Sequence, residues 1–213
     1  MQKGDRMWHH VRIQPWVGGK YHCPEVFPFR TLILGESNYT TPDIFSSDLV
    51  VNCVRTHLGQ NDDPNFSRFA TKIRRLACRS RENLSRKVFW SDVAFYNFIQ
   101  VLVGQAARDR PTEDMWYESV AAFGEVMEAL RPQRIWVLGK ANWRNFVRHV
   151  EHSRIDPDTV ELPLSGESVL ASYTNHPSSG ISYEKWAPVV ARILFDEHNN
   201  ALQATQGSCA PER

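Results

Sequence analysis

Residues 32–39 read LILGESNY, an apolar run that stops abruptly at small, polar and ionisable residues. Residues 172–180 read SYTNHPSSG and repeat this arrangement near the other end of the chain. A buried parallel strand that delivers polar groups to its carboxyl end has this appearance. Because ligands of open α/β sheets bind at that edge, the two segments predict a single cleft closed from both sides.

The other apolar segments alternate between strand and helix patterns. Strands are expected at 30–35, across 88–95, at 134–138 and at 168–173, and helices at 66–76, 116–130, 143–150 and 186–194. Thr112 is expected to cap the second helix, and Pro188 to lie in the first turn of the last one. This alternation predicts an α/β fold, a three-layer α/β/α sandwich around a central four-stranded parallel sheet.

Length and charge limit the domain organisation and the partners. The 213 residues predict one domain over 1–198 and, because the apolar pattern ends there, a disordered tail over 199–213. A net charge of +1 gives no overall attraction to a polyanion. The stretch from Lys72 to Lys87 is locally basic and includes Arg74 and Arg75. It fits either a solvated helix face or a ridge that contacts phosphates.

The cysteines give no sign of a metal site. Four are widely spaced and form no C-x-x-C pair: Cys23, Cys53, Cys78 and Cys209. Zinc and iron–sulfur sites take cysteines in close couples, so we expect no metal and no cofactor. No signal peptide opens the sequence, and no apolar stretch is long enough to span a bilayer. We therefore expect a monomeric cytoplasmic protein without membrane contact.

Polar side chains follow three of the predicted strands. They are Glu36, Ser37, Asn38 and Tyr39 after the first, Asn97 after the second, and His176, Ser178 and Ser179 after the last. Each has a purely structural alternative, since a His beside a Pro or an Asn after a strand is usually a turn or cap residue. Their shared place at carboxyl strand ends nevertheless predicts that they converge.

These motifs, in this order, resemble those of the uracil-DNA glycosylase superfamily over residues 18–194. The family's Gly-led first loop corresponds to residues 35–39, and its His-Pro-Ser motif to residues 176–179. The family's base-reading Asn corresponds to Asn97, and the turn after its third strand to residues 137–140. The resemblance implies hydrolysis of the bond between deoxyribose and a flipped-out pyrimidine of single- or double-stranded DNA, leaving an abasic site.

The resemblance also implies roles for single residues. His176 would donate a hydrogen bond to the departing base anion, as an oxyanion hole does. Asn97 would read the pairing edge of the base, and Tyr39 would pack against its C5 position. The implied contacts to the base further include Gly35, Ser37 and Phe45. The implied contacts to DNA are made by Lys140, Ser178 and Ser179, and Arg74 and Arg75 of the basic stretch are further candidates for contact with phosphates.

The first motif departs from the family pattern at Ser37, where well-known members carry an Asp or Asn that positions water. Serine is a poor general base, so Glu36 and Asn38 are expected to take over this role. The family branch with Gly-Glu at this place carries an iron–sulfur cluster whose cysteine spacing is absent here. The chain therefore resembles a divergent member, whose substrate is uracil or a modified pyrimidine such as a hypermodified cytosine of viral DNA.

Two other functions fit parts of the sequence. Residues 35–38 resemble the nucleophile turn of SGNH esterases, with Ser37 as nucleophile and His176 as base. Those enzymes place an Asp three residues before the His, a position held here by Tyr173. The second alternative is a reader that binds flipped bases without cutting. Binding and turnover measured on the same oligonucleotide would separate it from an enzyme.

Overall fold

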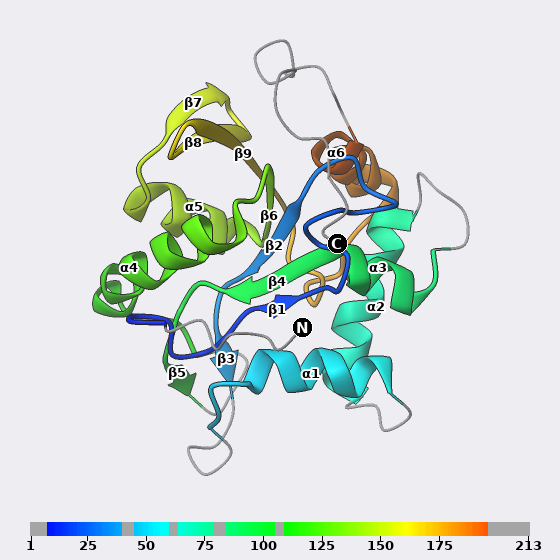
Figure 1. The fold of residues 1–213 in the computed structure, drawn as a ribbon, viewed down its shortest axis with the longest axis horizontal. Helices are drawn as coiled ribbons and strands as arrows, with labels where there is room; N and C mark the ends of the chain where they lie inside the picture. Colours follow the sequence, from blue (N-terminus) through cyan, green and yellow to red (C-terminus); the bar gives the residue numbers. More distant parts are fainter. Residues whose placement is uncertain (1–7, 40–44, 60–63, 79–83, 105–108, 196–213) are drawn as a thin grey trace, which may run out of the picture.

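The computed structural model describes residues 8–39, 45–59, 64–78, 84–104 and 109–195. A seven-stranded sheet in the order β1-β4-β2-β6-β9-β8-β7 forms its centre (Figure 1). Its strands are β1 (Trp16–Val17), β2 (Thr31–Gly35), β4 (Val93–Asn97), β6 (Arg134–Leu138), β7 (Ser153–Asp156), β8 (Thr159–Leu164) and β9 (Glu167–Thr174). A small second sheet pairs β3 (Asn38–Tyr39) with β5 (Leu102–Gly104). The predicted tail at 199–213 lies outside the described residues.

The four middle strands, β4, β2, β6 and β9, are parallel. They confirm the predicted parallel core of the sandwich. The predicted sheet was too small, because β1 pairs antiparallel to β4 and the β7–β8 hairpin extends the sheet beyond β9. The hairpin went unpredicted because β7 is mostly exposed and therefore lacks the continuous apolar run of a buried strand.

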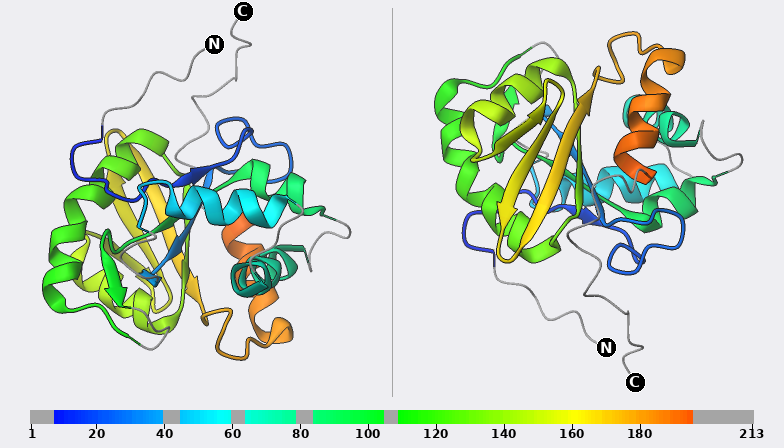
Figure 2. Two further views of the ribbon diagram at one scale, coloured as in Figure 1. Left: turned by 90° about the horizontal axis from the view of Figure 1, so that it is seen from below. Right: turned by 90° about the horizontal axis from the view of Figure 1, so that it is seen from above.

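Helices cover both faces of the sheet (Figure 2). The helices are α1 (Leu49–Leu58), α2 (Pro64–Cys78), α3 (Arg86–Asp92), α4 (Glu113–Leu130), α5 (Lys140–His149) and α6 (Tyr183–Phe195). Leu32 and Leu34 join a core with α4 and α5, whereas Ile33 joins a second core with α1, α2, α3 and α6. This alternation follows from the two-residue period of a strand buried on both faces.

Helix ends confirm one expectation and correct two. Thr112 caps α4 by accepting a hydrogen bond from the backbone N–H of Met115. Residues 88–90 are not strand, since Ser85 caps α3 there and β4 begins only at Val93. Pro188 is the sixth residue of α6 and not in its first turn, because the side chain of Ser182 starts the helix by accepting from Lys185 N–H.

The chain reverses its direction of travel across the sheet between β2 and β6. From β2 it proceeds to β4 on one side, and from β6 to β9 on the other. Such a switch point leaves a crevice at the carboxyl ends of the strands. Asn142 of α5 spans it, donating hydrogen bonds to the carbonyls of Leu34 and Leu138 over 3.2 and 3.3 Å.

Among the described helices, none is both long and apolar enough to cross a bilayer.

Candidate active site

The predicted polar residues follow strands that end at the same edge of the sheet. Gly35 at the end of β2 lies beside Asn97 at the end of β4, and Leu138 of β6 lies beside Thr174 of β9. His176 follows two residues later and packs against Gly139, on which a Cβ would come 3.3 Å from the His176 Cβ. Gly139 also has a positive φ of 105°, which favours glycine.

Gly35 leaves room for the side chain of Asn97. A Cβ at Gly35 would lie 1.9 Å from Asn97 Oδ1, a separation that no side chain tolerates. Backbone hydrogen bonds continue past the strand ends, from Phe98 N–H to the Gly35 carbonyl and from Ile99 N–H to the Glu36 carbonyl. The two loops are therefore held in register, and Asn97 is buried with only 8% of its surface exposed.

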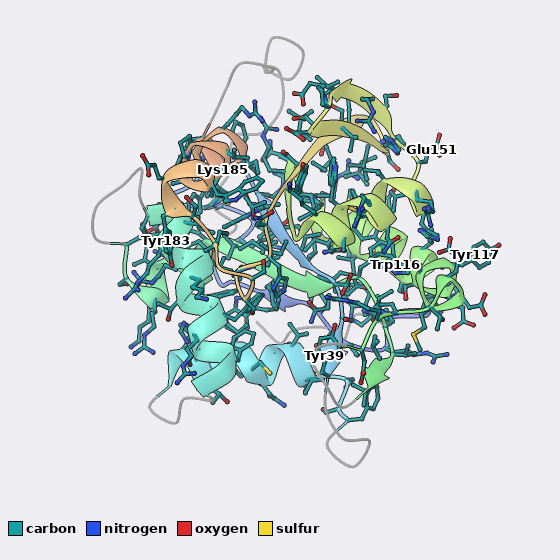
Figure 3. The ribbon with its side chains drawn as sticks, turned by 180° about the vertical axis from the view of Figure 1, so that it is seen from behind. Tyr39, Trp116, Tyr117, Glu151, Tyr183 and Lys185 are labelled. Atoms are coloured by element: carbon teal, nitrogen blue, oxygen red, sulfur yellow. The ribbon has the colours of Figure 1, made fainter. Side chains whose placement is uncertain are left out.

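The first loop divides its polar side chains between two hydrogen bonds. Asn38 Oδ1 accepts from Asn97 Nδ2 over 2.8 Å, and both carboxamides are buried. Ser37 Oγ donates to the Tyr39 hydroxyl over 2.9 Å, and Tyr39 is labelled in the lower part of Figure 3. The loop thus joins Asn38 to Asn97, whereas Ser37 is hydrogen-bonded within the loop, to Tyr39.

Glu36 forms an ion pair with Arg110, a residue that the sequence reasoning missed. Arg110 Nη1 lies 3.1 Å from Glu36 Oε2, and the glutamate side chain is only 10% exposed whereas that of the arginine is 65% exposed. Arg110 stands in the connection before α4, 74 residues from Glu36. No sequence motif marks it, so only folding brings this cation to the site.

His176 is held in one tautomer. Its Nδ1 accepts a hydrogen bond from Ser178 N–H at 3.2 Å, so the proton of the neutral ring sits on Nε2. Burial lowers the pKa of His176, and the cations of Arg110 and Lys72 lower it further. Within the described part of the chain, no group is hydrogen-bonded to Nε2. The site therefore offers a neutral imidazole with a free Nε2–H donor.

The ring and the turn of His176 are fixed from α2. Phe69 stacks on the imidazole with centroids 5.4 Å apart, and Lys72 Nζ donates to the Pro177 carbonyl over 2.9 Å. The hydroxyl of Ser179 donates to the His176 carbonyl over 2.8 Å. Phe69 belongs to the apolar stripe of the helix predicted at 66–76, a pattern that marks core residues and gives no sign of its contact with His176.

The basic side chains of α2 face two directions. Arg68, Lys72 and Arg75 recur at helical spacing, and Arg68 and Arg75 are exposed. Arg74 instead donates to the Leu84 carbonyl, and its Nε is buried. The geometry therefore does not support the predicted DNA contact of Arg74. The side chain of Arg75 is exposed and accessible to DNA.

The remaining predicted contacts are at or near the surface. Lys140 is exposed as the first residue of α5, directly after Gly139, and Ser178 is exposed after His176. Phe45 is 45% exposed and stacks on none of the described aromatic rings. The aromatic rings below the site are instead those of Phe69 and Phe95, whose centroids lie 6.1 Å apart.

The geometry does not favour the esterase alternative. A serine triad needs a histidine whose Nδ1–H donates to an acid and whose Nε2 accepts from the serine. Here Nδ1 of His176 accepts, and Ser37 donates to Tyr39. Tyr173, at the position of the orienting acid, donates its hydroxyl to Asp158 in the turn of the β7–β8 hairpin.

Among the described residues, no three His, Cys, Asp or Glu side chains are grouped so that they could hold a metal ion. No protein-family model matches the chain, and no curated protein sequence matches it.

Proposed function

We propose that the protein is a DNA glycosylase, a divergent relative of the uracil-DNA glycosylases. It hydrolyses the bond between deoxyribose and a flipped-out uracil or modified pyrimidine, leaving an abasic site. The observation that carries this proposal is the set of groups at one sheet edge. A buried, ion-paired Glu36, a buried Asn97 and a neutral His176 with a free Nε2–H all stand at the carboxyl ends of parallel strands of one sheet, β2, β4 and β9.

Departure of the base is the step that His176 assists. The C1′–N1 bond breaks, and its electron pair leaves with the base as an anion whose charge spreads to a carbonyl oxygen of the base. The Nε2–H of the neutral His176 ring donates a hydrogen bond to that oxygen. Removing one donor of this kind typically costs about 100-fold or more in rate. Arg110, which lies close enough to His176 to lower its pKa, adds positive charge near the leaving anion.

Attack of water is the step assigned to Glu36. Its carboxylate stabilises the positive sugar electrostatically and accepts a proton from the water that adds to C1′. The ion pair with Arg110 orients this carboxylate. Asn38 is committed to Asn97 by a hydrogen bond, which leaves Glu36 as the better of the two candidates for directing water.

Cations around the site supply the affinity for DNA. The exposed Arg68 and Arg75 of α2 share a face with Lys72, which donates to the Pro177 carbonyl, and the exposed Lys140 follows Gly139, which packs against His176. Lys and Arg side chains provide most of the sequence-independent binding to phosphates. In this proposal, these cations bind the phosphates close to the flipped nucleotide.

The test is an abasic-site assay without added metal. Its oligonucleotides carry uracil, 5-hydroxymethyluracil, cytosine, 5-hydroxymethylcytosine or glucosylated 5-hydroxymethylcytosine. Alkali-labile sites with one of these bases are the expected result, and His176→Ala or Asn97→Ala should abolish them with the fold intact. His152→Ala and Asn52→Ala, away from the site, are the matched controls. DNA binding without cleavage by the wild type would identify a non-catalytic reader, and absence of both would overturn the proposal.

A further inference from the structure

Gln100 is a buried residue that joins separate parts of the chain at the turn after β4. It lies three residues beyond Asn97, and only 4% of its surface is exposed. Its Oε1 accepts hydrogen bonds from the backbone N–H groups of Arg12 and Ile13 over 3.0 and 2.9 Å. Its Nε2 donates to the Asn97 carbonyl over 2.9 Å. One carboxamide therefore links the N-terminal segment to the main chain of Asn97.

The polarity of these partners fixes the orientation of the Gln100 carboxamide. All of them are backbone groups, which are N–H donors at Oε1 and a carbonyl acceptor at Nε2. If the carboxamide were turned over, its NH2 group would face donors and its oxygen would face an acceptor. The backbone N–H of Gln100 also donates to Ser119 Oγ, which itself donates to the Met115 carbonyl in α4. The turn is thus tied to α4 as well.

The hydrogen bond to the Asn97 carbonyl takes the place of a strand partner. This carbonyl and the N–H of Phe98 belong to one planar peptide, so they point in opposite directions. The Phe98 N–H donates toward β2, to the Gly35 carbonyl, and the Asn97 carbonyl therefore faces away from β2. On that side, β1 pairs with β4 no further than Phe95. Since a buried carbonyl needs a partner, Gln100 completes the hydrogen bonding at the end of β4.

The N-terminal segment that binds Gln100 is itself attached to α4. The carboxylate of Glu125 accepts hydrogen bonds from the backbone N–H groups of His9, His10 and Val11 at 3.0 to 3.3 Å. A cavity of about 120 Å³ remains between the segment and α4, and Gln100 is among the residues that line it. Hydrogen bonds therefore hold the segment where its packing against α4 is incomplete, and they give Gln100 a fixed point of attachment.

We propose that Gln100 is a positioning residue of the site, an inference that rests on the proposed glycosylase function. It holds the main chain of Asn97, and with it the Asn97 carboxamide, at the place where that carboxamide meets the flipped base. Gln100 acts through Asn97, because its own carboxamide is already bound to backbone groups. A displacement of about 1 Å in a group that positions a substrate can cost about 100-fold in rate.

The first test is Gln100→Met, which keeps the length of the side chain and removes its hydrogen bonds. On the base that wild type excises fastest, kcat should fall by about 10-fold or more. KM for DNA should change by less than about 2-fold, because other residues contact the phosphates. Thr31→Val is the matched control, since it removes another buried donor to a backbone carbonyl, that of Phe29, at the amino end of β2. The control should keep the wild-type kcat even if its Tm falls.

Gln100→Glu gives a readout that a purely structural role would not move. An ionised carboxylate still accepts from Arg12 and Ile13 but opposes the Asn97 carbonyl, whereas a protonated carboxyl donates to that carbonyl. The ratio of its kcat to the wild-type kcat should therefore rise by about 5-fold or more between about pH 9 and about pH 5.5, as the buried carboxyl binds a proton. Taking the ratio cancels the effect of His176 protonation, which is common to both proteins.

The outcomes distinguish this inference from the proposed function. A wild type that excises none of the bases would overturn the glycosylase proposal and, with it, the role given to Gln100. With an active wild type, three results would overturn the inference alone. They are an unchanged kcat in Gln100→Met, an equal loss of kcat in Thr31→Val, and a ratio for Gln100→Glu that does not change with pH. Any of them would show that the hydrogen bond to the Asn97 carbonyl does not control the rate.

Discussion

At the scale of single residues, His176 combines a defined tautomer with a lowered pKa. Burial, followed by the cations of Arg110 and Lys72, lowers the pKa from its usual 6.5. The Nε2–H donor exists in the neutral ring, which loses its hydrogen bond from Ser178 N–H when Nδ1 is protonated. The same shift makes the folded state less stable as the pH falls below 6.5, because the unfolded chain then binds more protons.

Arg110→Gln tests the electrostatics of this residue. Because protonation of Nδ1 breaks the hydrogen bond from Ser178 N–H that holds the ring, excision by the wild type should decline only below pH 6.5. Removing the cation raises the pKa of His176, so the acid limb of the pH profile of kcat should move to higher pH. The rate at neutral pH should also fall by about 10-fold or more, because Glu36 loses its partner. An acid limb that does not move would contradict the role of Arg110, and Arg148→Gln on α5 is the control.

Gly35→Ala tests the fit between β2 and Asn97. The added Cβ would lie 1.9 Å from Asn97 Oδ1, so the carboxamide must move. Excision should fall by about 100-fold or more, with a loss of about 1–3 kcal/mol in the free energy of unfolding from overpacking. Gly124→Ala in α4 is the matched control, because its Cβ meets nothing within 4 Å. Equal activity of the two variants would show that excision does not depend on the position of the Asn97 carboxamide.

At the scale of elements, α2 has three separate tasks. It buries Ile73 and Leu76 in the core, stacks Phe69 on His176, and presents Arg68 and Arg75 to solvent. The side chains repeat every three to four residues, so one helix can serve the core on one face and the site on another. The basic residues of the sequence therefore do not act as a single block.

Replacing both Arg68 and Arg75 by Ala tests the proposed phosphate ridge. Each lost phosphate contact should make the slope of log affinity against log salt less steep by about one. The double variant should therefore weaken DNA binding and lower that slope by about two, with kcat at saturating DNA unchanged. Arg74→Ala should leave the slope unchanged and lower the free energy of unfolding by about 1 kcal/mol, since it loses the bond to Leu84. An unchanged slope in the double variant would show that these arginines do not contact the phosphates of DNA.

At the scale of the whole molecule, the two halves of the sheet meet where Asn142 spans the switch point. Its Nδ2 donates to the carbonyls of Leu34 and Leu138, from which the Glu36 and Gly139 turns lead away. Asn142→Leu leaves these carbonyls without their side-chain donor and should cost about 1–3 kcal/mol of the free energy of unfolding. This corresponds to a fall in Tm of about 2–4 °C per kcal/mol. Calorimetry against the exposed control Asn52→Leu measures it, and an unchanged Tm would mean that other contacts hold the two halves together.

The parallel core of the fold was predictable because β2, β4, β6 and β9 are buried on both faces. Such strands need nearly continuous apolar residues, and the sequence contains those runs at the right spacing. The β7–β8 hairpin and β1 lack this pattern, since they gain their place by pairing with strands that already exist. Residues 88–90 are apolar on a short amphipathic helix, which a run of this length does not distinguish from a strand.

The sequence alone determined which residues reach the carboxyl edge of the sheet, because Glu36, Asn97 and His176 stand at the end of a strand or one or two residues after it. Tertiary structure alone decided what surrounds them. Arg110 meets Glu36 across 74 residues, and Phe69 reaches His176 from a helix 107 residues away. Asn38 accepts a hydrogen bond from Asn97 across 59 residues. Ion pairing, ring stacking and amide hydrogen bonding depend on distances of a few ångströms, and residues so far apart in the chain acquire such distances only when the sheet and its helices have packed.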